Sequence, residues 1–455
     1  RSLVLGGADT VPGETPVVHL VGARVSGKLR LVFAEACCVL RLEKCWFEQA
    51  PQLYGARLHV TGFGGSWLPG LGANSVTVEG DLDLMRARVA GTVTLTGAHI
   101  TGSLLLQGAR LSGAGAGTRT GTGTGTGTVG LALDGSRLEV GSGIVGRDGF
   151  RAEGEVRLPG ARAHGGLLLD GARLHHPGGE ALFAEGLQSA RVDCGQGFHA
   201  DGAVVLTGAA IEGTVSFEGG TVQNPAGDAI ACSRVQASEA HLETAHTEGT
   251  VDLRHARLDV LRTAHGAPEV PDVSPLRLDG LVYRAWEPMA PVAHRLATLR
   301  RDPDGYRPQP YQQLAAVCRS VGHDDEARRV LLARQRCRRG TLRPAGRAWG
   351  LLLDATVGHG YRPWLAGLWL TALTLLGTAA FGAAGPRPVK PGEGAPFSPL
   401  VYTLDLLIPF GGLGQRNSWY WEAGPVQWLA YALVAAGWLL TTAVVAGVTR
   451  VLNRS

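Results

Sequence analysis

Glycine-led units of eleven residues repeat three times between Gly80 and Gly113, and within each unit apolar and polar positions alternate. The units read GDLDLMRARVA, GTVTLTGAHIT and GSLLLQGARLS. Alternation with a period of two is typical of a short strand with one buried face, and the glycine and Gly-Ala steps favour turns between strands. Because the pattern recurs at a fixed period, it predicts a solenoid of stacked coils.

The repeat extends well beyond this stretch. A GAR step followed by an alternating run first occurs at Val21–Ala36, and GTVDLRHARLD at Gly249–Asp259 is a late unit. Two units form a coil of roughly 22 residues, so residues 1–282 predict on the order of a dozen coils. We expect a right-handed parallel β-helix, with the Gly/Thr tract Thr118–Thr128 as a loop. The predicted interior positions are Leu82, Leu84, Val93, Leu95, Leu104, Leu106, Val205 and Val215.

The spacing of apolar residues becomes helical after about residue 282, and residues 283–362 are predicted to form a basic helical linker domain. Tyr311–Val321 and Glu326–Arg339 predict an αα-hairpin, with Gly322 directly after the first helix. Arginines concentrate at the end of the second helix and beyond it, where we expect them to contact anionic lipid headgroups. This basic cluster comprises Arg334, Arg336, Arg338, Arg339, Arg343 and Arg347.

Two uncharged runs, Trp364–Ala384 and Val426–Thr449, are each long enough for a membrane-spanning helix, which needs about 20 residues. Basic residues concentrate before the first run and after the second, and the intervening loop carries only three. By the positive-inside rule, residues 363–455 predict a two-span hairpin of a multi-pass cell-membrane protein with both termini cytoplasmic.

Between the two runs, FSPLVYTLDLLIP predicts a short apolar helix over residues 398–409, because Pro399 suits the first helical position and Pro409 ends the run. Two interpretations remain open. The helix lies at the membrane interface, or it is a re-entrant pore helix and residues 397–414 line a pore. The candidate residues in both cases are Tyr402, Asp405 and Pro409, and Asp405 is the acidic group that an ion path would use.

Composition narrows the functional classes. The 455 residues include 67 glycines and carry a formal net charge of only +4, so nucleic acid is not the expected partner. Seven cysteines without a CxxC spacing predict free thiols in a reducing compartment. The sequence has no GxGxxG turn that opens a helix, and no HExxH or GxSxG motif. His241, His246 and His255 lack the spacing of ligands, so we predict no catalytic residue, cofactor or metal.

Several segments together resemble a known family. They are the repeat steps GARVSG and LLLQGARLSG, the link PQPYQQLAAVCRSVGHDDEARRVLLARQRCRR, the sequence WGLLLDATVGHGYRPW and the loop FSPLVYTLDLLIPFGGLGQRNSWYW. They are similar to segments of actinobacterial membrane proteins with pentapeptide-like, β-helical repeats, which are often labelled membrane-associated oxidoreductases. The resemblance implies a membrane location and a repeat fold, and the label implies a redox reaction.

Three functions follow as hypotheses. The first is a membrane-anchored, non-enzymatic scaffold that presents the β-helix to a protein partner from the lipid bilayer. The second is a homo-oligomeric two-span channel or sensor, with residues 397–414 as its pore segment. The third is the membrane-associated oxidoreductase of the family label, which no motif in the sequence supports. The regularity of the repeats favours the scaffold, since active sites usually break local structural rules.

Overall fold

The computed structural model of the chain describes residues 4, 16–36, 38–113, 130–263, 274–340, 364–390, 396–408, 412–422 and 424–452, without the side chains of 339–340, 364–366 and 443–452. These residues divide into two compact units, Arg1–Val321 and Gly322–Ser455. The Gly/Thr tract Thr118–Thr128 lies outside the described residues.

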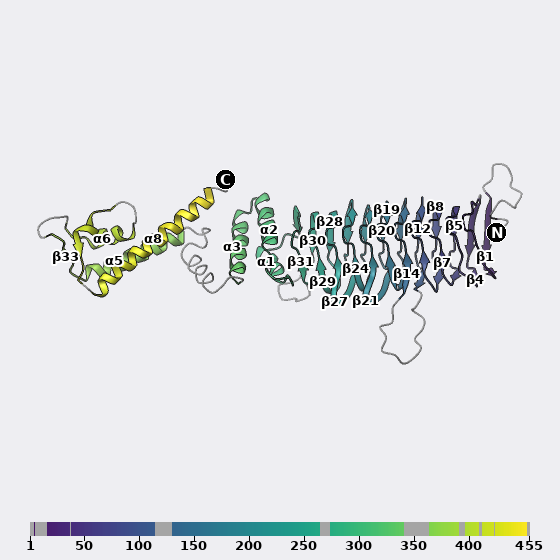
Figure 1. Cartoon of the computed structure of the whole chain (residues 1–455), viewed down its shortest axis with the longest axis horizontal. Coiled ribbons are helices and arrows are strands. Elements are labelled where there is room, and N and C mark those ends of the chain that lie inside the picture. Colours follow the sequence, from purple (N-terminus) through teal and green to yellow (C-terminus); the bar gives the residue numbers. More distant parts are fainter. Residues whose placement is uncertain are drawn as a thin grey trace, which may run out of the picture. The chain divides into compact units, whose positions relative to one another are not determined.

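The first unit is a β-solenoid of about 11 turns, which confirms the predicted β-helical repeat. Its strands stack in parallel, coil upon coil, as the row of arrows in Figure 1 shows. Each coil passes through two sheets. Equivalent positions in successive coils lie 22 residues apart where no insertion intervenes, as for Asn74 and Thr96, whose side chain and backbone are hydrogen-bonded.

Seventeen of the described strands form the first sheet. They are β1 (Val17–Val21), β3 (Val39–Glu43), β5 (Arg57–Gly62), β8 (Thr77–Asp83), β11 (His99–Ile100), β12 (Ser103–Leu105), β15 (Glu139–Val140), β16 (Gly143–Val145), β19 (Arg162–Ala163), β20 (Leu167–Leu168), β22 (Gln188–Ser189), β23 (Val192–Asp193), β25 (Ala210–Ile211), β26 (Thr214–Ser216), β28 (Gln236–Leu242), β30 (Arg257–Thr263) and β32 (Ala285–Glu287).

Fifteen of the described strands form the second sheet. They are β2 (Arg24–Val25), β4 (Trp46–Phe47), β6 (Trp67–Leu68), β7 (Leu71–Gly72), β9 (Arg88–Val89), β10 (Val93–Thr94), β13 (Arg110–Ser112), β14 (Leu131–Asp134), β17 (Arg151–Glu153), β18 (Glu155–Arg157), β21 (Arg173–Phe183), β24 (His199–Val205), β27 (Thr221–Ala231), β29 (His246–Asp252) and β31 (Leu276–Arg277).

The interior of the solenoid is aliphatic, and all but one of the predicted interior residues are buried. The exception is Val205, which is half-buried, while Val204 takes the inward position. The inward positions alternate without a break through this segment, with Ala200, Gly202, Val204 and Leu206 facing inward. Val204 and Leu206 follow Gly202 by two and four residues, as the buried Val93 and Leu95 follow Gly91. The prediction of Val205 is therefore offset by one residue from the repeat.

Two helices, α1 (Val292–Arg300) and α2 (Pro308–Ser320), lie against the C-terminal end of the solenoid. Gln309 on α2 accepts the backbone N–H of Gly280 at 2.9 Å and donates to the carbonyl of Leu281 at 2.8 Å. Gln313 donates to the carbonyl of Tyr283 at 2.6 Å. These amides satisfy backbone groups that the last coil would otherwise expose at an open strand edge.

Two arginines of the last coils are held by carboxylates. Arg254 donates through Nε and Nη2 to the two oxygens of Asp252, at 2.9 and 2.7 Å. Arg277 pairs with Asp228, and its Nε lies 3.3 Å from Asp304. Burial raises the pKa of Asp252, but its hydrogen bonds with Arg254 outweigh burial, so the net pKa lies below 3.8. These pairs link the last coils to the loop that precedes α2.

The second unit is helical. Its elements are α3 (Asp324–Gly340), α5 (Trp364–Gly382), β33 (Arg387–Pro388), α6 (Pro399–Leu407), α7 (Gln415–Ser418), β34 (Trp419–Tyr420) and α8 (Pro425–Leu452). The helices α2 and α3 fall on the segments predicted as an αα-hairpin, and α6 falls on the predicted loop helix. The short strands β33 and β34 are antiparallel.

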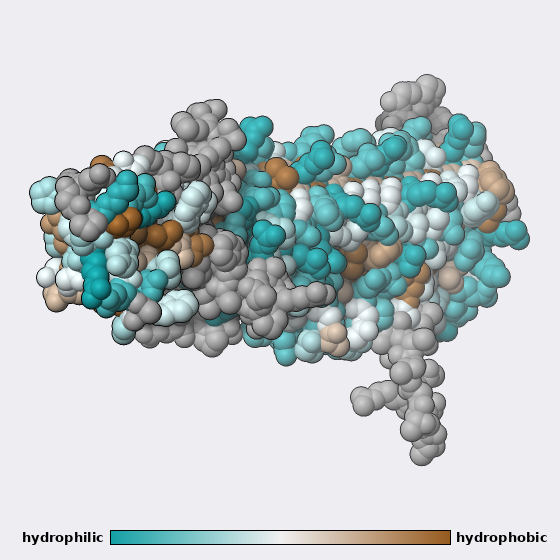
Figure 2. All heavy atoms as spheres, turned by 60° about the vertical axis from the view of Figure 1, so that its left-hand side comes forward, coloured by the Kyte–Doolittle hydropathy of each residue, from teal (hydrophilic) through white to brown (hydrophobic). Residues whose placement is uncertain are grey.

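The short helix α6 packs against both α5 and α8 around an aromatic and aliphatic core, which includes Phe381, Tyr402 and Leu433. Glycines permit the close approach: a Cβ at Gly437 would lie 2.2 Å from the carbonyl oxygen of Leu407, so only glycine fits there. Large apolar side chains also remain exposed on α5 and α8, and hydrophobic side chains are visible among these helices in Figure 2.

The prediction of two membrane-spanning helices is wrong. The helices α5 and α8 occupy the two uncharged runs, but no helix within the described ranges is long and apolar enough to cross a membrane. Hydroxyls interrupt α5, where Thr371, Thr374 and Thr378 each donate to the carbonyl four residues before them. Near the start of α8, Gln427 donates to the hydroxyl of Tyr431. The two uncharged runs therefore contain polar side chains that a count of charged residues does not register.

Candidate functional site

The basic cluster predicted from the sequence is described only in part. Arg334 on α3 is half-buried, and Arg336 and Arg338 are exposed. The side chain of Arg339 and the residues Arg343 and Arg347 lie outside the described residues. The cluster therefore provides no geometry from which a site can be built.

Tyr402 and Asp405, predicted as pore or loop-helix residues, are buried on α6. Both carboxylate oxygens of Asp405 accept backbone N–H groups of the following loop, at 2.7 Å each. The hydroxyl of Tyr402 accepts the indole N–H of Trp421 at 3.1 Å, and burial raises the pKa of Tyr402. Pro409 lies outside the described residues. A carboxylate that orders a loop in this way holds the fold of the second unit together.

The described cysteines form no disulfide with one another, in agreement with the prediction of thiols, and all except the half-buried Cys337 are buried. Cys37 lies outside the described residues. Burial raises the pKa of Cys232 to about 12 and the pKa of Cys194 well above its usual range. Because the thiolate is the reactive form, these two thiols are poor candidates for redox chemistry.

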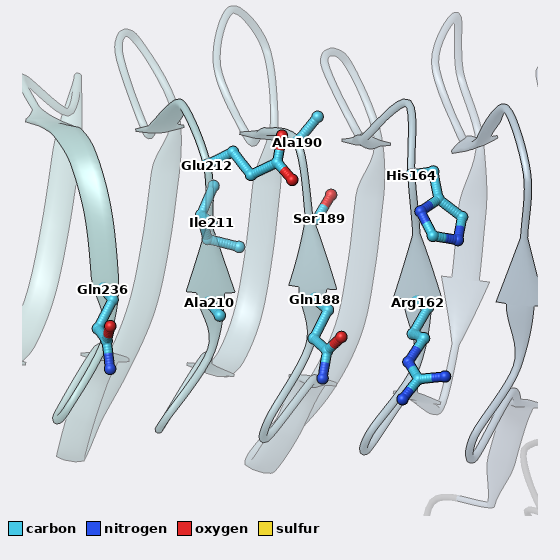
Figure 3. A pocket seen from close by; sticks show the side chains of 9 residues that line it. All are labelled: Arg162, His164, Gln188, Ser189, Ala190, Ala210, Ile211, Glu212 and Gln236. Atoms are coloured by element: carbon cyan, nitrogen blue, oxygen red, sulfur yellow. The ribbon is translucent and has the colours of Figure 1, made fainter.

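A shallow polar groove of about 350 Å³ lies on the first sheet (Figure 3). Arg162, Gln188, Ala210 and Gln236 stand side by side across it on β19, β22, β25 and β28, where they are register partners. The groove forms because Ala210 interrupts a row of long polar side chains. Glu212 and His164 lie further along the strands.

The described residues that line the groove include no side chain arranged as an activated nucleophile. The hydroxyl of Ser189 is buried within hydrogen-bond distance of the carbonyls of Ala163 and Arg191, at 3.0 and 2.9 Å. His164 lies 3.7 Å from Glu139 of the preceding coil. The groove therefore offers exposed hydrogen-bonding side chains, and the structure gives no activated nucleophile in it.

The second sheet carries a row of four arginines on neighbouring coils. Arg88, Arg110, Arg151 and Arg173, here called the arginine ladder, are consecutive register partners on β9, β13, β17 and β21. All four side chains are exposed. Strands in a sheet lie about 4.8 Å apart, so the ladder places four guanidinium groups along roughly 14 Å of the solenoid axis.

The sequence places each of these arginines between two buried residues. Arg110 follows Ala109 and precedes Leu111, which are at most 1% exposed. Because side chains alternate across a strand, a residue between two inward positions must point outward. Each turn has a left-handed residue, a glycine in all but the turn before Arg88, and the arginine follows that residue by two positions. Gly108, for example, has φ of +66°.

The arginines of the ladder make no ion pair with any residue in the described part of the solenoid. Arg24, three coils before Arg88 in the same row, differs because its Nη2 lies 2.8 Å from Glu48. Positive charges on neighbouring strands repel one another, and such a row is destabilising unless another group neutralises it. An unpaired row of this length is therefore a feature that the fold itself does not require.

Two tryptophans continue the row toward the N-terminus. Trp46 and Trp67 are stacked with ring centroids 5.0 Å apart, and Trp67 is the register partner of Arg88. The guanidinium of Arg24 covers Trp46 at 4.9 Å. Arginine and tryptophan are the residues most enriched among the dominant contacts of protein interfaces.

The positions two residues after the arginines form the flank of the ladder. Ala90 and Ser112 are small and uncharged beside Arg88 and Arg110. Glu153 is exposed beside Arg151, and the following position, His175, lies 2.9 Å from Asp201 of the next coil. The electrostatic field of the ladder is therefore most positive at the end that adjoins the tryptophans.

Sequence reasoning identified the GAR step as a turn signal but did not identify the ladder. The signal was present in the 22-residue interval that separates Arg88 from Arg110 and Arg151 from Arg173, which places equivalent positions in register. The Gly/Thr tract lies between Arg110 and Arg151 and obscures that they are neighbours. Comparison of the chain with family models, curated proteins and solved structures found no match.

Proposed function

We propose that the protein is a non-enzymatic interaction scaffold whose solenoid binds an acidic partner protein through the arginine ladder. The observation that carries this proposal is the row of four exposed arginines without described ion-pair partners. A partner that supplies carboxylates would relieve their mutual repulsion and form charge-assisted hydrogen bonds, which are stronger than neutral ones.

The surroundings of the ladder support a protein partner. Trp46 is stacked on Trp67 and is covered by the guanidinium of Arg24, so Trp46 offers no open platform for nucleobases, which single-stranded nucleic acids need. The small residues Ala90 and Ser112 leave the guanidinium groups of Arg88 and Arg110 accessible.

The test is binding of a fluorescent polyglutamate peptide to the full chain, measured by anisotropy at about 0.1 M salt, where the Debye length is ~10 Å. The ladder variant Arg110→Glu/Arg151→Glu removes two contacts and adds repulsion, so we expect a loss of about 100-fold, or ~2.7 kcal/mol. The matched control Arg57→Glu/Arg257→Glu makes the same change of charge at exposed positions of the first sheet.

The control should bind within about threefold of the unmodified chain, which corresponds to ~0.7 kcal/mol. Equal losses in the two variants would show that only net charge matters and would overturn the proposal. Failure of the unmodified chain to bind the peptide would overturn it as well. Circular dichroism melting of both variants establishes that the solenoid remains folded.

A further inference from the structure

The spacing of the ladder points to the kind of segment that binds it. We infer that the partner presents an α-helix with a stripe of acidic residues, laid along the solenoid axis across Arg88, Arg110, Arg151 and Arg173. This inference rests on the proposed function, because it names the partner element for the same surface.

The repeat distances of the two surfaces agree. On a helix, residues at i, i+3 or i+4, and i+7 share one face, and their average step is about 5.3 Å along the axis. The strands of the ladder repeat at about 4.8 Å. Over the three steps between Arg88 and Arg173 the two series differ by roughly 1.4 Å, which the flexible arginine side chains accommodate by small changes of rotamer.

An extended segment fits less well. Side chains on one face of a β-strand repeat at about 6.7 Å, so three steps cover ~20 Å against ~14 Å for the ladder. The difference of roughly 6 Å would leave at least one arginine opposite the wrong face of the strand. Four carboxylates in a helical stripe can each pair with one arginine of the ladder. Four carboxylates on one face of an extended chain cannot pair with the same four arginines.

The flanks of the ladder give room for a helix. On one side Ala90 and Ser112 are short, and on the other the turn preceding Arg110 and Arg173 has glycine at Gly108 and Gly171. Arg110 therefore stands above its neighbours on both sides, whereas Glu153 and His175 flank Arg151 and Arg173. A helix, about 10 Å in diameter, can approach the ladder most closely around Arg110.

The tryptophans give the complex a second contact. Trp46 is 40% exposed at the end of the row, in line with the arginines. An apolar residue that follows the acidic stripe on the same helix face would pack against its edge. Aromatic anchors of this kind commonly supply much of the energy of an interface, and charges then fix its register.

Three synthetic peptides of about 20 residues, long enough to be helical in isolation, test the inference. The first has glutamates in one helical stripe, the second has the same composition with the glutamates spread around the helix, and the third keeps the stripe with a central proline. We expect the full chain to bind the first at least ten times more tightly than the other two. The ladder variant Arg110→Glu/Arg151→Glu should abolish this preference.

The outcomes separate the inference from the proposed function. One outcome is equal affinity for all three peptides, with binding lost in the ladder variant and kept in the control Arg57→Glu/Arg257→Glu. This outcome would overturn the inference of a helical stripe and would still support an acidic partner. Binding of none of the peptides, or tighter binding of a single-stranded oligonucleotide of equal charge, would overturn both. Circular dichroism of the free peptides establishes which of them are helical.

Discussion

Two groups of arginines in the solenoid differ in what surrounds them. Arg254 and Arg277, in the last coils, are paired with Asp252, Asp228 and Asp304. The arginines of the ladder project from strands of the second sheet and make no such pair within the described residues. The first group has partners that the chain supplies, and the second is left with its charge exposed.

The paired arginines stabilise the fold, whereas the ladder arginines are the ones that we assign to binding. Buried or half-buried carboxylates around Arg254 and Arg277 tie the end of the solenoid to the loop before α2. Unpaired like charges on adjacent coils instead cost stability, because neighbouring strands bring them close together. A surface that lowers stability is consistent with selection for binding, as functional sites commonly break the rules that the rest of a fold obeys.

Carboxylates introduced beside the ladder should remove the difference between the two groups of arginines. We expect this change to have the largest effect on binding. The double variant Ala90→Glu/Ser112→Glu keeps every arginine but places carboxylates on the same face beside Arg88 and Arg110. We expect the affinity for an acidic peptide to fall about 30-fold, or ~2 kcal/mol, because the added carboxylates compete for the guanidinium groups. Fluorescence anisotropy measures the loss.

Stability should not decrease in this double variant. An unchanged affinity would show that the arginines of the ladder are not the contact surface. The corresponding neutral variant, Ala90→Gln/Ser112→Gln, is the control for the bulk of the new side chains and should retain most of the binding.

Removing a partner from the paired arginines should affect stability and leave binding intact. Asp252→Asn removes a buried carboxylate from the Arg254 pair, and we expect a loss of about 1–3 kcal/mol in the free energy of unfolding. Thermal denaturation followed by circular dichroism measures it. Asp259→Asn, which removes an exposed partner of Arg284, is the matched control and should cost at most ~1 kcal/mol.

The same pair predicts a pH dependence. Because the folded pKa of Asp252 lies below 3.8, its stabilisation is complete above that value and is lost as the pH falls from 3.8 toward the folded pKa. The stability difference between the unmodified chain and Asp252→Asn should therefore narrow in acid. A difference that widened as the pH fell would contradict the assignment.

The alternation of apolar and polar residues predicted the solenoid, its coil length and nearly all of the tested interior positions, because burial of every second side chain is a local rule. Val205 is an exception, because the repeat places aliphatic residues two and four positions after its leading glycine, which after Gly202 are Val204 and Leu206. The predicted membrane spans failed for a different reason. Absence of charge does not make a run uniformly apolar, because threonines lie in α5 and a glutamine and threonines lie in α8.

The ladder could not be read from the sequence in the same way. A GAR step predicts that its arginine points outward, but it does not predict which of the two sheets contains that arginine. Arg110 and Arg162 both follow this step, yet one lies in the second sheet and the other in the first. Only the coil register, which the Gly/Thr tract obscures between Arg110 and Arg151, brings the four arginines into one row.

The smallest expected effect concerns the acidic flank of the ladder. Glu153 is exposed beside Arg151, and its negative charge repels an acidic partner. Glu153→Gln should raise the affinity for an acidic peptide by about two- to threefold, or ~0.4–0.7 kcal/mol, and the gain should shrink at high salt. A titration at two ionic strengths measures both. A gain that salt does not reduce would point to a cause other than charge.

Site-specific photo-crosslinking tests the central claim most directly. The photoreactive residue p-benzoylphenylalanine replaces Ala90 beside the ladder in one variant and Ala210 in the groove of the first sheet in the other, and both alanines are exposed in the unmodified chain. Each full-length variant is irradiated with the striped acidic peptide. The account predicts crosslinked peptide from position 90 and none from position 210. Crosslinking from position 210 without crosslinking from position 90 would contradict it.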